Sequence, residues 1–244
     1  MWERSVSTQR LARLFLRLGL ATLSLQAHGF RMTAKAKICG LSTTEAVNAA
    51  LAGGAALIGF VFFEASPRRV SPEDAARLAL PARGAAQIVA VTVDPDDSLI
   101  DRLTAVLKPD LIQLHGREAP ARVQEIRERW GTRVIKAVPI SDSRDVDAAT
   151  AYEAVSDHLM FDARPPIGAD RPGGVGARFD WEVLSGRRFA RPWLLAGGLD
   201  PWNVGEAISQ AKAPMVDVSS GVERGPGLKD PALISTFLEA VSRA

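Results

Sequence analysis

From Lys35 to the C-terminus, short apolar runs rich in β-branched residues alternate with segments whose apolar residues recur at helical spacing. The run at residues 56–63 is apolar along nearly its whole length, as in a parallel strand covered on both faces. Ser71-Pro72 and Asp94-Pro95 are typical helix openers. The predicted strands are residues 35–39, 56–63, 87–93, 111–115, 133–140, 158–162, 192–197 and 215–219. The predicted helices are residues 43–53, 72–80, 96–108, 119–130, 144–155, 180–186, 201–212 and 230–243.

Eight strand-then-helix units in succession predict an α/β protein with a (β/α)8 or TIM barrel, compact but complete. The alternative is an open doubly wound sheet, which usually has fewer strands. No low-complexity linker or shift in composition divides the chain after residue 34. We therefore expect one catalytic barrel domain at residues 35–244 and a separate extension at residues 1–34.

The extension carries five arginines and a single glutamate. Our first hypothesis is a translated upstream stretch, with Met32 as the real start. A targeting segment or an additional amphipathic helix are the alternatives. Its apolar stretch from Leu18 to Leu25 is too short and too close to arginines to span a membrane. None of these hypotheses bears on the chemistry of the barrel.

The composition, with 47% hydrophobic and 24% charged residues, is that of a soluble globular protein. Beyond residue 34 the chain has 25 basic and 27 acidic residues, so no basic surplus suggests nucleic-acid binding. One cysteine excludes an internal disulfide and a cysteine-based zinc cluster, and it fits a reducing cytoplasm. The three histidines show no metal-ligand spacing, so we expect no metal site.

Several chemically active side chains stand where the predicted strands end, and in a (β/α)8 barrel those ends form the active-site rim. Cys39 ends the first strand, beside a helix N-terminus that would favour a thiolate, although a lone cysteine is more often a small buried hydrophobe. Each of the other residues at these strand ends could also be a purely structural residue, such as a helix cap, a core residue or a solvated charge. Their joint position on one rim argues for a site. These residues are Arg68, Arg69, Gln113, His115, Asp162, Gly197, Gly198, Asp217, Ser219, Ser220 and Gly221.

Two glycine- and serine-rich loops follow the seventh and eighth strands, at Gly197-Gly198 and Ser219-Ser220-Gly221. In many barrels these loops, with a short extra helix, bind a phosphate through backbone N–H groups. The segment from Gly221 to Lys229 is long enough for such a helix. Gly174-Val175-Gly176 lacks the third glycine of a dinucleotide fingerprint, so we interpret it as a mobile loop that closes over the rim.

The chain from Lys35 onward resembles the phosphoribosylanthranilate isomerase family of tryptophan biosynthesis, and its motifs stand in that family's order. Any one motif is a weak signal, but together they are spread over six of the eight units. They are Lys37-Ile38-Cys39-Gly40, Gly59-Phe60-Val61-Phe62, Ser66-Pro67-Arg68-Arg69, Gln113-Leu114-His115-Gly116, Gly173-Gly174-Val175-Gly176, Leu195-Ala196-Gly197-Gly198 and Asp217-Val218-Ser219-Ser220-Gly221.

The resemblance implies an Amadori rearrangement of N-(5-phosphoribosyl)anthranilate, with Asp162 as general acid and Cys39 as general base. It implies no metal, nucleotide or redox cofactor. Arg68, with Arg69 as the adjacent alternative, would face the anthranilate carboxylate. The implied substrate-binding residues are Arg68, Gln113, His115, Gly174, Gly197, Gly198, Asp217, Ser219, Ser220 and Gly221.

Three competing functions have different chemical requirements. The sugar isomerase of histidine biosynthesis resembles this family but has an aspartate where Cys39 stands. Indoleglycerol-phosphate synthase needs a lysine and glutamate pair that these strand ends lack. The third is a catalytically silent phosphosugar-binding barrel. We expect a cytoplasmic enzyme, monomeric or homodimeric, that binds a small phosphorylated sugar–anthranilate substrate and neither nucleic acid nor membrane.

Overall fold

The computed structural model describes residues 34–166, 168, 172–174 and 176–244, all within one compact unit, Met32–Ala244. The predictions for the extension therefore lie outside the described residues, apart from Ala34. No helix among the described residues is long and apolar enough to cross a membrane.

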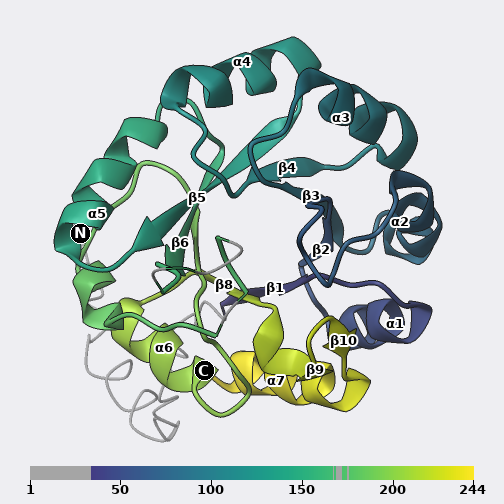
Figure 1. Ribbon diagram of the computed structural model, residues 1–244. Coiled ribbons are helices and arrows are strands. Elements are labelled where there is room, and N and C mark those ends of the chain that lie inside the picture. Colours follow the sequence, from purple (N-terminus) through teal and green to yellow (C-terminus); the bar gives the residue numbers. More distant parts are fainter. Residues whose placement is uncertain (1–33, 167, 169–171, 175) are drawn as a thin grey trace, which may run out of the picture. The chain divides into compact units, whose positions relative to one another are not determined.

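Eight parallel strands form a closed barrel in the order of the sequence, and β8 returns to pair with β1. Figure 1 shows the barrel with the helices arranged around its outside. The predicted (β/α)8 fold is confirmed. The strands are β1 Lys35–Cys39, β2 Leu57–Val61, β3 Gln87–Thr92, β4 Leu111–Leu114, β5 Arg133–Ile140, β6 His158–Ala163, β7 Trp193–Leu195 and β8 Met215–Val218.

Helices begin where the sequence offers a cap. Ser71 accepts a hydrogen bond from the backbone of Asp74 at the start of α2, and Asp96 caps α3 in the same way. The α-helices are α1 Thr44–Ala52, α2 Pro72–Leu78, α3 Asp97–Arg102, α4 Pro120–Trp130, α5 Ser143–Ala149, α6 Val204–Ala211 and α7 Pro231–Arg243. The 3₁₀ and π turns are η1 Leu80–Ala82, η2 Leu103–Leu107, η3 Thr150–Tyr152, η4 Trp181–Leu184 and η5 Ser220–Val222.

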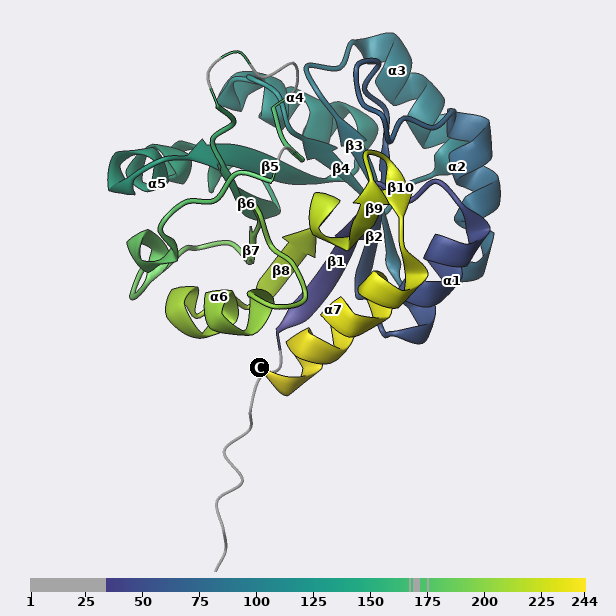
Figure 2. The same cartoon turned by 60° about the horizontal axis from the view of Figure 1, so that its bottom comes forward.

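Two local predictions need correction. The helix predicted at 180–186 is only the short 3₁₀ turn η4, because Ser185 at its C-terminal end already has extended backbone. The helix expected within the 221–229 segment is limited to η5, and the rest forms a two-stranded hairpin, β9 Glu223–Gly225 and β10 Leu228–Lys229. Figure 2 shows this hairpin at the carboxyl end of β8.

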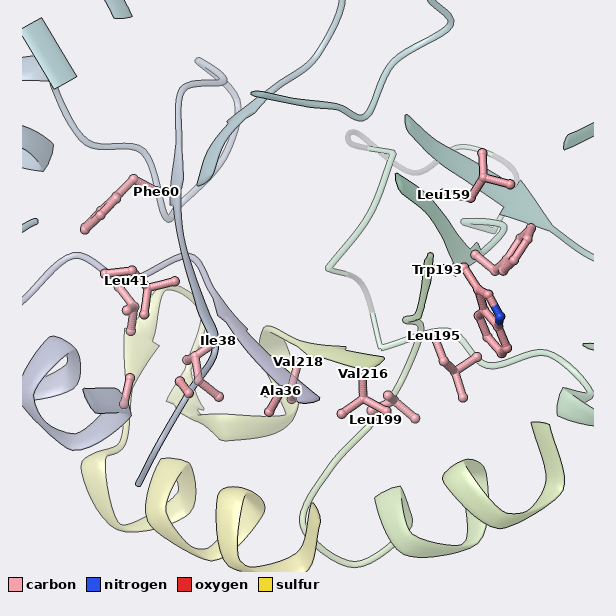
Figure 3. Close-up of a cluster of buried hydrophobic side chains, with 14 of the residues drawn as sticks. Ala36, Ile38, Leu41, Phe60, Leu159, Trp193, Leu195, Leu199, Val216 and Val218 are labelled. Carbon is pink, nitrogen blue, oxygen red and sulfur yellow. The ribbon is translucent and has the colours of Figure 1, made fainter. Parts of the chain in front are cut away.

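Successive side chains of each strand point to opposite faces of the sheet, so the buried apolar residues form two layers. Ala36 and Ile38 of β1 pack outward with Val216 and Val218 of β8, in the layer beneath the helices α6 and α7 (Figure 3). The intervening residues face into the barrel, where Cys39 joins a second cluster that includes Val89 and Met160. Each large apolar side chain buried in this way contributes roughly 1.5–3 kcal/mol. A polar side chain on the same strand face as Cys39 therefore needs a hydrogen-bond or ion-pair partner inside the barrel.

His158, at the start of β6, gives the fold a measurable pH dependence. Its Nδ1 has no partner among the described residues, and burial, aided by Arg133 and Lys35, lowers its pKa. Below about pH 6.5 the unfolded chain takes up a proton at this histidine that the folded protein does not. The free energy of unfolding therefore decreases as the pH is lowered. We expect His158→Gln to remove this component. Denaturant unfolding of both proteins at about pH 8 and about pH 5.5 measures it. Equal losses of stability in the two proteins would contradict the prediction.

Candidate active site

A pocket opens at the carboxyl ends of the barrel strands, and most of the predicted site residues line it. Val61, Val91 and Ala196 supply apolar wall between the polar groups. Gln113 and Gly221 are not among the lining residues; Gln113 is fully buried one position below the rim. The predicted site residues that line the pocket are Cys39, Arg68, His115, Asp162, Gly174, Gly197, Gly198, Asp217, Ser219 and Ser220.

Cys39 is a buried free thiol at the end of β1. The chain of the neighbouring strand β2 passes close to it at Gly59. A methyl group added at Gly59 would lie 3.3 Å from both Cys39 Sγ and Lys37 Nζ. Glycine at this position therefore leaves room for a thiol and an ammonium side by side. Burial raises the pKa of Cys39, and the nearby positive charge of Lys37 only partly offsets it.

Lys37 has no exposed surface, and its ammonium donates a 2.7 Å hydrogen bond to Asp217 Oδ1 on β8. Burial alone would discharge this lysine, but the carboxylate of Asp217, with a smaller contribution from Cys39, holds its pKa above the usual value. The cation beside the thiol is therefore permanent at physiological pH. Sequence analysis did not assign it a role, although a lysine two residues before Cys39 must share the face of that strand.

Arg68 is buried and clamped by Glu223 through two hydrogen bonds, Nε to Oε1 at 2.7 Å and Nη2 to Oε2 at 2.9 Å. Its Nη2 also donates to the carbonyl of Gly174, which fastens the loop after β6. Its Nη1 donates no hydrogen bond to any described residue. Arg69 is half exposed and pairs with Glu64 outside the lining of the pocket. Of the two arginines considered, only Arg68 faces the pocket.

Glu223 and Lys229 are further charged residues that sequence analysis left without a role. Lys229 donates to Glu223 Oε1 at 2.6 Å and to the carbonyl of Ser219 at 2.7 Å. Burial lowers the pKa of Lys229, and the carboxylate of Glu223 opposes that effect. The hairpin therefore anchors both Arg68 and the loop after β8. Strands of three and two residues leave no pattern in the sequence, and the one available signal was the turn at Gly225-Pro226-Gly227.

On the other side of the pocket, Asp162 at the end of β6 is paired with His115, which follows β4. Asp162 Oδ2 lies 3.0 Å from His115 Nε2, and the other ring nitrogen lies 2.8 Å from Gln113 Nε2. Gly173 packs against this contact, because a methyl group there would lie 2.8 Å from both Asp162 Oδ2 and His115 Nε2. A carboxyl group and a thiol therefore face one pocket from different strands.

The glycine- and serine-rich loops have the backbone geometry of an anion cradle. Gly197 and Gly198 have φ of 90° and 60°, and neither backbone N–H donates to any described residue. A methyl group at Gly221 would lie 1.9 Å from the carbonyl oxygen of Leu199, so these two loops touch through their backbones. The arrangement suits a phosphate.

No group of three or more histidine, cysteine, aspartate or glutamate side chains in the described part of the chain is placed to hold a metal ion. The chemical groups that line the pocket are one thiol, the carboxyl groups of Asp162 and Asp217, one imidazole, one guanidinium and the hydroxyls of Ser219 and Ser220.

Comparison with known proteins gives a consistent result. The sequence profile of the family described as N-(5'phosphoribosyl)anthranilate (PRA) isomerase matches residues 36–240. The N-(5'-phosphoribosyl)anthranilate isomerase of Caulobacter vibrioides is 66% identical over 223 residues, which cover 91% of this chain and 99% of the relative. That of Mesorhizobium japonicum is 48% identical over 208 residues, covering 85% and 95%.

Solved structures agree. The phosphoribosyl anthranilate isomerase of Thermotoga maritima is 34% identical with a TM-score of 0.77, covering 86% of this chain and 100% of its own. A second structure of such an isomerase, in complex with reduced 1-(o-carboxyphenylamino)-1-deoxyribulose 5-phosphate, is 33% identical with a TM-score of 0.75, at the same coverage.

Cys39 is the only cysteine of the chain, so alkylation by iodoacetamide reports on it alone. Because burial raises its pKa, a smaller fraction is thiolate at any given pH than in the unfolded chain. We expect the midpoint of the alkylation rate against pH to lie higher in the folded protein than in the same protein in denaturant. Restricted access lowers the rate but does not move this midpoint. A folded midpoint at or below the denatured one would contradict the prediction.

Proposed function

We propose that Asp162 is the general acid and Cys39 the general base of this chain, which belongs to the N-(5'-phosphoribosyl)anthranilate isomerase family. The reaction is the isomerisation of N-(5'-phosphoribosyl)anthranilate to 1-(2-carboxyphenylamino)-1-deoxyribulose 5-phosphate in tryptophan biosynthesis. The observation that carries the assignment is the pocket itself, which Cys39 and Asp162 line from different strands.

The first step opens the furanose ring. Asp162 gives its proton to the ring oxygen, the C1–O bond breaks toward that oxygen, and the amine lone pair forms a C1=N iminium. A carboxyl group can do this only in its protonated form. Asp162 is mostly buried beside an imidazole and Gly173, and no lysine or arginine side chain bonds to it among the described residues.

The second step removes the proton from C2. The iminium acidifies this C–H bond, whose electron pair forms C1=C2 as the C=N electrons return to nitrogen, and the proton goes to the Cys39 thiolate. Lys37, held beside Sγ by its ion pair with Asp217, stabilises that thiolate. A thiol with a raised pKa is less often ionised, but its thiolate is a stronger base. The enolamine then becomes the ketone as C1 takes up one proton and the C2 hydroxyl releases one. Net return of a proton from Cys39 to Asp162 restores both groups.

We place the substrate phosphate on the loops at Gly197-Gly198 and Ser219-Ser220, whose backbone N–H groups suit an anion. The anthranilate carboxylate is placed near Arg68, whose Nη1 group remains available while Glu223 holds the rest of the guanidinium in plane. Binding at both ends would hold the ribose between Asp162 and Cys39. A monomer or homodimer in the cytoplasm also remains a prediction.

Removing either proton-transfer group tests the assignment. Asp162→Asn keeps the shape of the carboxyl group but cannot deliver a proton, and the hydroxyl of Cys39→Ser is too weak a base. We expect each variant to lose kcat by about 100-fold or more while the protein remains folded. Steady-state kinetics and thermal unfolding measure the two effects. Near-normal kcat in either variant would remove that residue from the mechanism.

The two arginines provide a matched pair for the substrate's carboxylate end. Arg68→Ala should raise KM about 10-fold or more, since hydrogen bonds to charged groups contribute roughly 1.5–3 kcal/mol. Glu223 keeps its ion pair with Lys229 in this variant, so the network survives. Inhibition by inorganic phosphate should hardly change, and Arg69→Ala should behave as wild type. Parallel losses of substrate and phosphate affinity, or an effect confined to Arg69→Ala, would contradict the proposed placement of the carboxylate at Arg68.

A further inference from the structure

Gln113 is buried beneath the pocket and lies against His115, the one described side chain that hydrogen-bonds to Asp162. We infer that Gln113 is a positioning residue: it holds His115 as the neutral tautomer protonated on Nε2, so that the transferable proton of Asp162 resides on Oδ1. This inference rests on the proposed role of Asp162 as general acid.

The contacts of the Gln113 side chain define its orientation. Its amide nitrogen lies 2.8 Å from His115 Nδ1 and 3.4 Å from Met160 Sδ, and its oxygen Oε1 is buried with no partner among the described residues. Reversing the amide would set its oxygen, an acceptor, against Met160 Sδ and would lose the contact between the amide nitrogen and that sulfur. With the nitrogen toward His115, both amide N–H groups have an acceptor, Nδ1 and Sδ, so this orientation is favoured.

This orientation selects the histidine tautomer. An amide nitrogen can only donate, so His115 Nδ1 must accept and cannot carry a proton. The neutral ring then has its proton on Nε2, 3.0 Å from Asp162 Oδ2. A doubly protonated ring would place two N–H groups against each other at Nδ1. Gln113 therefore keeps Asp162 beside a neutral imidazole instead of a cation, and a neutral neighbour does not oppose protonation of the carboxyl group.

The tautomer also decides which oxygen of Asp162 is the acid. Oδ2 accepts the Nε2–H hydrogen bond, so a proton on this carboxyl group must sit on Oδ1. Oδ1 hydrogen-bonds to no described residue, and Asp162 lines the pocket. Gly173 packs against the Oδ2···Nε2 contact, where a side chain would collide with both atoms. The free oxygen is therefore the one available to a ligand.

The test combines a spectroscopic signature with kinetics. In protein carrying ¹⁵N-labelled histidine, two-bond ¹H–¹⁵N spectra at the pH of the assay distinguish protonated from unprotonated ring nitrogens. The chain has three histidines, so His28→Gln and His158→Gln variants assign the His115 signals. In wild type we expect a protonated Nε2 and an unprotonated Nδ1.

Gln113→Glu replaces the donor by a carboxylate that can only accept, so a proton should move onto Nδ1. We expect kcat to fall about 10-fold or more, since general acid catalysis contributes 10²–10⁴-fold, with KM changed less than about 2-fold because Gln113 does not line the pocket. Gln113→Met, with no polar group, should show a mixture of tautomers and an intermediate kcat. Gln124→Glu, the same change on an exposed face of α4, is the control.

Two results would overturn the inference: a wild-type His115 protonated on Nδ1, or a Gln113→Glu variant with an unchanged ¹⁵N pattern, whatever its kcat. These results are distinct from failure of the proposed function. Normal turnover by Asp162→Asn would remove the general acid without altering the His115 spectrum of wild type, whereas a wrong tautomer would leave the loss of activity in Asp162→Asn in place.

Discussion

The ion pair between Lys37 and Asp217 is the interaction on which the site depends. It joins β1 to β8, the two strands whose pairing closes the barrel, and it places a cation in a wholly buried interior. Breaking such a pair by removing one partner costs roughly 3–5 kcal/mol, because the other charge is left buried and unpaired. The same lysine stands beside the thiol of Cys39. Closure of the barrel and the placement of a positive charge next to the proposed base are therefore one feature.

The remaining charges divide the pocket into two sides. On the β1 and β8 side, Lys229 holds Glu223 and Glu223 holds Arg68, so the proposed carboxylate-binding group is fixed before a ligand arrives. On the opposite side, Asp162 hydrogen-bonds to the imidazole of His115 and to no other described side chain. A cation favours the anionic form of a base, and the neutral imidazole that we infer for His115 adds no positive charge beside the proposed acid. The buried cation therefore lies on the side of the pocket that carries the proposed base, and the proposed acid lies on the opposite side.

The sequence predicted the fold and the rim because both follow from local periodicity. Alternation along the strands places Lys37 and Cys39 on one face, and strand ends in a barrel converge regardless of loop detail. It could not show that Asp217 forms an ion pair with Lys37, because that pair depends on the register in which β1 and β8 meet to close the barrel. The hairpin that holds Glu223 and Lys229 has strands of three and two residues, too short to produce a pattern. The buried position of Gln113 likewise depends on packing beneath the rim.

The most direct test of this account is an ultraviolet titration of the thiolate of Cys39, the only cysteine in the chain. The comparison is between wild type and the double variant Lys37→Met/Asp217→Asn, which removes both charges together and leaves no buried ion without its partner. The positive charge of Lys37 lowers the pKa of Cys39 more than Asp217 raises it. The account predicts that the midpoint of thiolate formation moves to higher pH in the double variant, whereas an unchanged or lower midpoint would contradict it.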